Sequence, residues 1–124
     1  MTEVLAAVSE PIVSVIVPTR NAPPTLGRTL AHLVNQTLSP RPYEVVVVTG
    51  GSTEDVWRRA PAGLKDPAAA SLALRVLSQP GQGAARRRNA GAAAARGKLL
   101  VFLDDDMAAD PGLLQAHLRA HAGH

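Results

Sequence analysis

Four mainly apolar runs recur along the chain, and each is followed by a polar or glycine-rich turn. They cover residues 12–17, 43–48, 72–77 and 99–103. The first two are rich in β-branched residues, which favour strands. Continuous apolar runs are typical of strands that are buried on both faces of a parallel sheet. The pattern therefore predicts four buried strands, the first of them ended by Pro18, because proline cannot donate to a strand ladder.

The first two intervals between these runs carry helix signals. Leucines at helical spacing predict a helix with one apolar face over residues 24–38. A shorter helix to residue 59 is predicted from Ser52 or Thr53, either of which can cap its first turn. These two helices would connect the first three strands.

Two further helices are predicted in the second half of the chain. An alanine-rich stretch indicates a helix over residues 84–96, ended by Gly97 as the residue after the cap. Its alanines at positions 85, 92 and 95 would allow it to lie close on a sheet. Asp110 as N-cap and Pro111 at the first helical position predict a last helix to about residue 120.

Strands that alternate with helices predict an open, mainly parallel α/β sheet of about four strands, of Rossmann-like type. Ligands of such sheets bind beyond the carboxyl ends of the strands. Each run is followed there by an unusual cluster, and we expect the four clusters to share one rim. They are Pro18-Thr19-Arg20-Asn21, Thr49-Gly50-Gly51-Ser52, Gly81-Gln82-Gly83 and Asp104-Asp105-Asp106.

The three consecutive aspartates are the main candidate for chemistry. In an extended backbone side chains alternate, so Asp104 and Asp106 would point one way and Asp105 the other. Two converging carboxylates suit Mg²⁺ or Mn²⁺, whose remaining positions water and phosphate oxygens can fill. We therefore expect Asp104 and Asp106 to hold a divalent ion against a diphosphate. The alternative is that the acids only begin a loop or cap the next helix.

The cluster Gly81-Gln82-Gly83 precedes a predicted helix, whose free N–H groups favour an anion. It is not a dinucleotide fingerprint, because Arg86 stands where the third glycine would be, and a plain loop is an equal alternative. Three successive arginines, at positions 86 to 88, lie about 100° apart on a helix and cannot all face one ligand. We expect Arg88 to point inward, on the same stripe as Ala92 and Ala95.

Composition narrows the class of protein. The 124 residues allow one domain, contain no cysteine and include no apolar run long enough to span a bilayer. Residues 1–10 carry acids rather than the basic start of a signal peptide, so we expect a cytoplasmic protein. The net charge is +3, and eleven of the thirteen basic residues are arginine, which favours an anionic partner. Only three aromatic residues are available for stacking, which argues against nucleic acid.

Several of these motifs together resemble family 2 glycosyltransferases, in order and over about residues 12–121. The matching segments are Val13 to Asn21, Leu33-Val34-Asn35-Gln36-Thr37, the valines 45–48 with Gly51-Ser52-Thr53, Arg88-Asn89-Ala90-Gly91, and Phe102-Leu103-Asp104-Asp105-Asp106. The last of these is similar to the D-x-D motif of that family. Several motifs in register make the resemblance specific.

The resemblance implies a GT-A fold, a nucleoside-diphosphate sugar donor and Mg²⁺ or Mn²⁺ on Asp106, with Asp104 near the ribose or sharing the metal. It assigns Thr19 and Arg88 to the nucleotide pocket. Together with the rim argument, it gives a full set of candidates. The nucleotide-sugar candidates are Pro18, Thr19, Arg20, Asn21, Thr49, Gly50, Gly51, Arg88, Asp104 and Asp105, and the metal candidates are Asp104 and Asp106.

Two departures from the family pattern limit what it implies. Thr49-Gly50 stand where the family usually has acids that contact the nucleotide, so the nucleotide stays open. The acceptor half and the catalytic base of the family lie downstream of the D-x-D motif, and no candidate base is evident. We therefore expect residues 1–10 to be a flexible leader and residues 11–124 to be an incomplete, donor-binding α/β domain without its acceptor half.

Three functions compete. The first is a glycosyltransferase domain with an unknown acceptor, and the second is a non-catalytic binding or assembly module of the same fold. The third, a receiver-like phosphoacceptor, ranks last, because the first two strands end in Pro18-Thr19 and Thr49-Gly50 rather than in an aspartate. An incomplete sheet would also leave an open edge and an apolar face, so we expect a homo-oligomer.

Overall fold

Four parallel strands form the centre of the computed structural model, which describes residues 13–36, 43–65, 73–81 and 83–122. The strand order is β3-β2-β1-β4, and every pair is parallel. Their bounds are β1 Val13–Thr19, β2 Tyr43–Thr49, β3 Ala73–Ser78 and β4 Leu99–Phe102. The predicted open, parallel α/β sheet of four strands is thereby confirmed. The leader expected over residues 1–10 lies outside the described residues.

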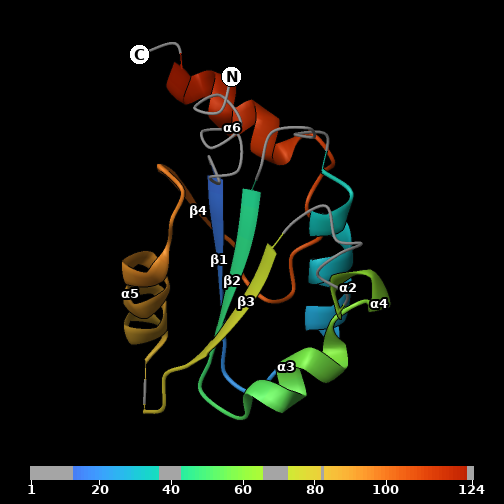
Figure 1. The fold of residues 1–124 in the computed structure, drawn as a ribbon, viewed down its shortest axis with the longest axis vertical. Coiled ribbons are helices and arrows are strands. Elements are labelled where there is room, and N and C mark those ends of the chain that lie inside the picture. Colours follow the sequence, from blue (N-terminus) through green and yellow to red (C-terminus); the bar gives the residue numbers. More distant parts are fainter. Residues whose placement is uncertain (1–12, 37–42, 66–72, 82, 123–124) are drawn as a thin grey trace, which may run out of the picture.

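Helices cover both faces of this sheet (Figure 1). Helix α5 (Ala84–Ala94) lies on one face, and α2 (Pro24–Val34), α3 (Thr53–Arg59) and α4 (Ala62–Lys65) lie on the other. Helix α6 (Leu113–Ala122) lies near the end of the sheet where the strands begin. The carboxyl ends of the strands are at the opposite end of the molecule, beside α3.

The two faces bury cores of different size. On the α2 side, the leucines of α2 pack with alternate residues of β1 and β2 and with Leu114 of α6. On the α5 side, the described residues form a smaller buried core of Ile16, Val46 and Val48, with partly buried neighbours. Gly91 lies against it, since a Cβ there would overlap Ile16 Cγ2 and come 3.1 Å from Val48 Cγ2. Gly91 is therefore the point of closest approach of α5. Of the predicted alanines, Ala95 packs against this core, whereas Ala85 is exposed.

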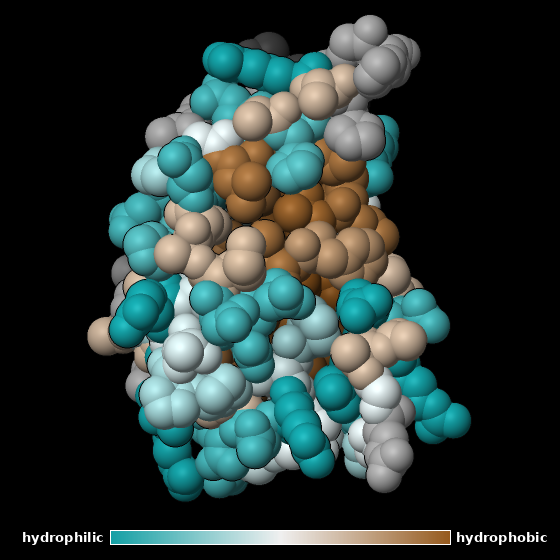
Figure 2. All heavy atoms as spheres, turned by 180° about the vertical axis from the view of Figure 1, so that it is seen from behind, coloured by the Kyte–Doolittle hydropathy of each residue, from teal (hydrophilic) through white to brown (hydrophobic). Residues whose placement is uncertain are grey.

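Strand β4 differs from its prediction. It lies at the edge of the described sheet and is not buried on both faces, since Phe102 is 46% exposed. Phe102 pairs with Ile16 and so faces the α5 side, but α5 packs mainly against β1 and β2. Leu100, which is half-buried, lies on the same face of β4 as Phe102. Figure 2, seen from behind, shows an apolar surface on this side of the molecule. A continuous apolar run cannot tell a central strand from an edge strand.

Strand β1 continues through Pro18, which was expected to end it. The N–H of Leu103 donates to Ile16 O at 3.0 Å, and β4 pairs no further along β1. Alternate residues of a parallel strand direct their backbone hydrogen-bonding groups to the same side. Pro18 is therefore directed to the same side as Ile16, but it lies beyond the last residue of β1 that pairs with β4. The missing N–H therefore breaks no ladder bond.

Three helix ends also differ from their predictions. Helix α2 ends at Val34, capped by Asn35, rather than near residue 38, which is outside the described residues. Helix α5 ends at Ala94 with Ala95 as its C-cap, so Gly97 is not the residue after the cap. Gly97 instead approaches the start of β1, where a Cβ would come 2.7 Å from Ser14 N. Helix α6 begins two residues late, because Asp110 first closes a turn by accepting from Gly112 N at 2.9 Å.

A buried polar network joins α5 to the start of the strands on the same face. The carboxylate of Glu44, only 1% exposed, accepts from Ser14 Oγ at 2.6 Å, Arg96 N at 2.7 Å and Arg75 Nη1 at 3.1 Å. Arg75 Nη1 also donates to Ala94 O at 2.7 Å, at the last turn of α5. Burial would raise the pKa of Glu44, but these hydrogen bonds and the Arg75 charge outweigh it and lower the pKa.

Candidate nucleotide-sugar site

The carboxyl ends of all four strands meet at one rim, as predicted. Gly50 N donates to Thr19 O at 3.0 Å, which joins the ends of β1 and β2. Gln79 N donates to Thr49 O at 2.8 Å and joins the ends of β2 and β3. The end of β4 joins through Asp105, whose Oδ2 accepts from Thr19 Oγ1 at 2.7 Å. Residues that are far apart in sequence therefore share one rim.

Thr19 is the central residue of this rim and is almost completely buried. Its hydroxyl donates to Asp105 and accepts from Ala22 N at 3.2 Å, in the turn before α2. Thr29 of α2 donates to Asp105 O at 3.0 Å. These bonds hold the backbone of the aspartate cluster against β1 and α2.

The three aspartates do not continue the strand. Strand β4 ends at Phe102, and Met107 N donates to Asp104 O at 3.3 Å, which closes a turn over these residues. The extended backbone predicted over Asp104 to Asp106 is therefore wrong, and the shared direction of Asp104 and Asp106, which was argued from it, stays a prediction. Asp105 is half-buried and bonded to Thr19, whereas Asp104 and Asp106 are exposed.

The carboxylate oxygens of Asp104 and Asp106 suit a hard cation, provided that a bound ligand supplies further oxygen atoms to it. Within the described part of the chain, no group of three or more His, Cys, Asp or Glu side chains could hold a metal ion by itself. The carboxylates of Asp104 and Asp106 form no hydrogen bond or ion pair with other described residues, so their oxygens are available. Two carboxylates leave most positions of a Mg²⁺ or Mn²⁺ ion for water and phosphate oxygens.

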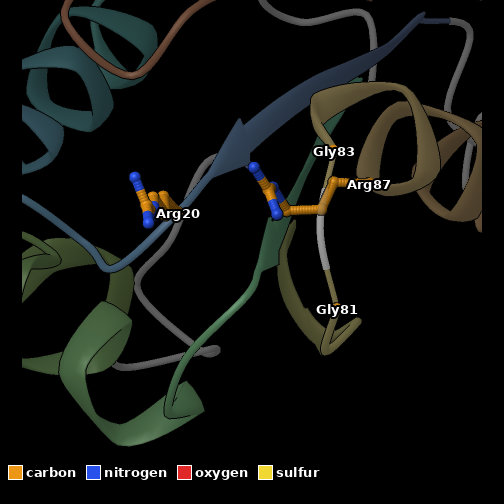
Figure 3. Close-up of a pocket in the computed structure, with 4 residues that line it drawn as sticks. All are labelled: Arg20, Gly81, Gly83 and Arg87. Carbon is orange, nitrogen blue, oxygen red and sulfur yellow. The ribbon is translucent and has the colours of Figure 1, made fainter.

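A cavity of about 400 Å³ opens at the same rim and is lined by Arg20, Gly81, Gly83 and Arg87. Figure 3 shows that Arg20 lies just after β1 and that the Arg87 side chain reaches from α5 toward the strands. Gly81 and Gly83 have φ values of 107° and 106°, a region that favours glycine. Gly81 and Gly83 of the predicted glycine cluster therefore line a cavity together with two arginine side chains. Gln82 itself is outside the described residues.

The inward arginine of α5 is Arg87, and the prediction that Arg88 points inward is wrong. Arg87 is 9% exposed and Arg88 is exposed. The buried stripe of α5 is Arg87 and Gly91, four residues apart, because Gly91 is where the helix meets the sheet. Counting back one turn from Gly91 could have identified Arg87, whereas the alanine stripe selected Arg88. A role of Arg88 in nucleotide binding stays a prediction.

The other candidates occupy different parts of the rim. Pro18 is half-buried within β1, and Thr49 is buried at the end of β2, where its Oγ1 accepts from Gly51 N at 3.0 Å. Asn21 and Gly51 are exposed, and Gly50 is half-buried. Every candidate therefore lies at or beside the rim, but only Arg20 is among the cavity residues named above.

None of the helices in the described ranges has both the length and the apolar character needed to cross a membrane. A family model described as Glycosyl transferase family 2 matches residues 14–124. Validoxylamine A glucosyltransferase of Streptomyces hygroscopicus subsp. limoneus is 40% identical over 115 residues, covering 91% of this chain and 24% of that protein. The uncharacterized glycosyltransferase EpsJ of Bacillus subtilis is 34% identical over 96 residues, covering 77% of this chain and 26% of that protein.

Solved structures share this fold. Staphylococcus aureus TarS 1-349 superposes with a TM-score of 0.72 and 27% identity, over 90% of this chain and 32% of that one. Mannosyltransferase PcManGT from Pyrobaculum calidifontis, solved with GDP-Man and Mn²⁺, gives a TM-score of 0.64 and 31% identity, over 78% of this chain and 28% of that one. The chain spans about a quarter of the length of the curated relatives that it matches. It belongs to glycosyl transferase family 2 and has the GT-A fold.

Proposed function

We propose that this chain is the donor-binding part of a glycosyltransferase, which binds a nucleoside-diphosphate sugar through a divalent ion on Asp104 and Asp106 for transfer to an unknown acceptor. The observation that carries the proposal is the pair of exposed, unbonded carboxylates at the rim where all four strand ends meet. Structures of the similar TarS hold UDP or UDP-GlcNAc, and that of PcManGT holds GDP-Man and Mn²⁺, which supports this ligand class.

Each residue of the aspartate cluster would have a different role. Asp105, bonded to Thr19, would position the loop, and Asp104 and Asp106 would supply oxygen ligands. A bound Mg²⁺ or Mn²⁺ ion would neutralise charge on the diphosphate as it leaves. Thr19 and the neighbouring backbone of Gly50 would keep this loop beside the nucleotide. The cytoplasmic location stays a prediction.

Calorimetry with UDP-, GDP- and TDP-sugars, with and without Mn²⁺, tests the proposal. At least one sugar nucleotide should bind more tightly with Mn²⁺, and Asp106→Asn should weaken that binding by about tenfold or more, as the loss of a metal ligand does. Asp110→Asn removes the same charge at the turn before α6 and should have no effect. The absence of metal-dependent binding for every nucleotide would contradict the proposal.

The exposed edge of β4 favours a second candidate, a non-catalytic binding or assembly unit of the same fold. Among the described strands β4 pairs only with β1, and its outer edge adjoins the apolar surface around Phe102. Edges and apolar patches of this kind promote pairing with a second copy. Self-association in light scattering without sugar hydrolysis or transfer would favour this candidate, and turnover would favour the enzyme.

A further inference from the structure

We propose that Thr29 and Gln36 are positioning residues for the divalent ion, because they hold the two ends of the loop that carries Asp106. That loop comprises residues 105–110 and is named the aspartate loop. Resting on the function proposed above, this inference assigns a role to two buried side chains, one on α2 and one just beyond it. Both donate hydrogen bonds to the loop, and Figure 1 shows the segment between β4 and α6 beside α2.

Both residues are polar exceptions among apolar neighbours. Thr29 is 1% exposed, and Gln36 is 6% exposed. The other buried residues of α2 are Leu26, Leu30 and Leu33. A buried polar side chain costs free energy unless it is hydrogen-bonded. Each of the two has one bond to its own helix, at 3.2 Å for Thr29 and 3.4 Å for Gln36, but its shorter bonds go to the aspartate loop.

The first end of the aspartate loop is held at Asp105. Thr29 Oγ1 donates to Asp105 O at 3.0 Å, and Thr19 Oγ1 donates to Asp105 Oδ2 at 2.7 Å. Helix α2 therefore fixes the backbone of this residue, and β1 fixes its side chain. Because Asp105 directly precedes Asp106, these two bonds determine the point from which the candidate metal ligand projects.

The second end is held at Asp110 by a single side-chain amide. Gln36 Nε2 donates to Asp110 O at 2.8 Å, and Gln36 Oε1 accepts from Leu114 N at 3.0 Å, at the start of α6. Leu114 is fully buried, and Ala109 is 5% exposed in the same core. Gln36 thus joins the end of the loop to α6 by acting as both donor and acceptor. A side chain that can only donate or only accept cannot replace it.

Between the two held ends, the aspartate loop faces solvent. Asp106, Met107 and Ala108 are exposed, and Ala109 already returns to the core. A short loop that is closed at both ends has few conformations, because the freedom of its backbone is already reduced. A divalent ion needs its oxygen ligands in a defined arrangement, so restraint of Asp106 relative to Asp104 should favour metal binding.

Backbone motion tests the positioning role in the absence of any ligand. Thr29→Val and Gln36→Met keep a similar side-chain volume and remove the hydrogen-bonding group. Amide order parameters of residues 105–108, measured by NMR in the free protein, should fall from about 0.85 to below about 0.6 in both variants. The values in β1 and β2 should not change. Thr29→Ser keeps the hydroxyl and should restore the loop, and Thr25→Val, at an exposed position one turn earlier on α2, is the matched control.

Metal-dependent binding tests whether this restraint serves the ion. Calorimetry uses a UDP-, GDP- or TDP-sugar, with Mn²⁺ and with EDTA. The gain in affinity on adding Mn²⁺ should fall about tenfold in Thr29→Val and Gln36→Met, as it does when other residues that orient metal ligands are replaced. The affinity in EDTA should change less than about twofold, because the sites that the nucleotide itself contacts are unaltered. A general loss of folded protein would instead lower both affinities together.

The outcomes separate this inference from the function on which it rests. A more mobile loop together with a loss confined to the Mn²⁺-dependent affinity, both restored in Thr29→Ser, supports the inference. Unchanged order parameters, or equal losses with Mn²⁺ and with EDTA, would overturn it. Binding with Mn²⁺ that Asp106→Asn weakens and that Thr29→Val and Gln36→Met leave intact would also overturn it, while the proposed function stands. If no sugar nucleotide binds the unmodified chain with Mn²⁺, the proposed function fails, and the metal role of Thr29 and Gln36 fails with it.

Discussion

The sheet face that α5 covers has a buried charged side chain near each of its ends, and the two differ in whether the protein supplies their hydrogen-bond partners. Where the strands begin, the Glu44 carboxylate accepts from Ser14, Arg75 and Arg96. Where the strands end, Arg87 is nearly as well buried, yet its Nε has no partner among the described residues. Arg87 belongs to the first turn of α5 and Glu44 accepts from Arg96 just after its last turn, so the two groups lie on either side of the contact between Gly91 and Ile16.

The difference indicates which end of the sheet stabilises the fold and which end is available to a ligand. A buried charge that the chain itself pairs fixes the position of α5 on the sheet. A buried charge that the chain leaves unpaired lowers the stability of the free protein and is explained by a partner that binds there. Four changes test this comparison, from the largest expected effect on stability to the smallest.

Glu44→Ala should destabilise the fold most. It leaves the Arg75 guanidinium, the Ser14 hydroxyl and the Arg96 amide without their shared acceptor. We expect the free energy of unfolding, measured by urea denaturation, to fall by about 3 kcal/mol. The control Glu54→Ala removes a carboxylate whose side chain is 81% exposed and should cost less than about 1 kcal/mol. Equal losses in the two variants would contradict the structural role of Glu44.

The acid sensitivity of the fold should depend on the same carboxyl. Because the folded-state pKa of Glu44 is lowered, its contribution is complete above the unfolded value of about 4.3. That contribution is lost as the pH falls through the lower, folded-state pKa. Unfolding free energies measured from pH 7 to pH 3 should therefore decline less steeply in Glu44→Gln than in the unmodified chain. Parallel profiles would show that other carboxyls control the acid response.

Arg87→Met should act in the opposite direction at the other end of the face. Methionine fills similar space without a charge, so removing the unpaired guanidinium should raise the free energy of unfolding by about 1 kcal/mol. The measurement is urea denaturation in buffer without phosphate or nucleotide. A loss of stability on substitution would show that Arg87 serves the fold, as Glu44 does.

The fold could be predicted from sequence because its signals are local. Four apolar runs, the Ser52 cap of α3 and the alternation of strands with helices each depend on neighbouring residues, and all of them appear in the structure. The shared rim was also predictable, since parallel strands must end at the same edge. The edge position of β4 was not, because strand order depends on long-range pairing that an apolar run does not encode.

For the site, the loops that form it could be predicted, but the directions of their side chains could not. Which arginine of α5 points inward depends on where the helix touches the sheet, and that contact is set by Gly91 against Ile16. The direction of the aspartates depends on a hydrogen bond from Thr19, 86 residues away in sequence, which fixes Asp105 in a turn. Spacing along the chain carries neither fact, so the wrong arginine was chosen and a turn was predicted as extended backbone.

The smallest effect on stability should come from the aspartates that were singled out first. Asp104 and Asp106 are exposed and form no hydrogen bond or ion pair with other described residues. Asp104→Asn and Asp106→Asn should therefore change the free energy of unfolding by less than about 0.5 kcal/mol. Asp105→Asn alters the group that accepts from Thr19 and should cost more than either. If the outer two were as costly as Asp105, their carboxylates would be committed to the fold, and the rim would not be the end of the sheet that is left free for a ligand.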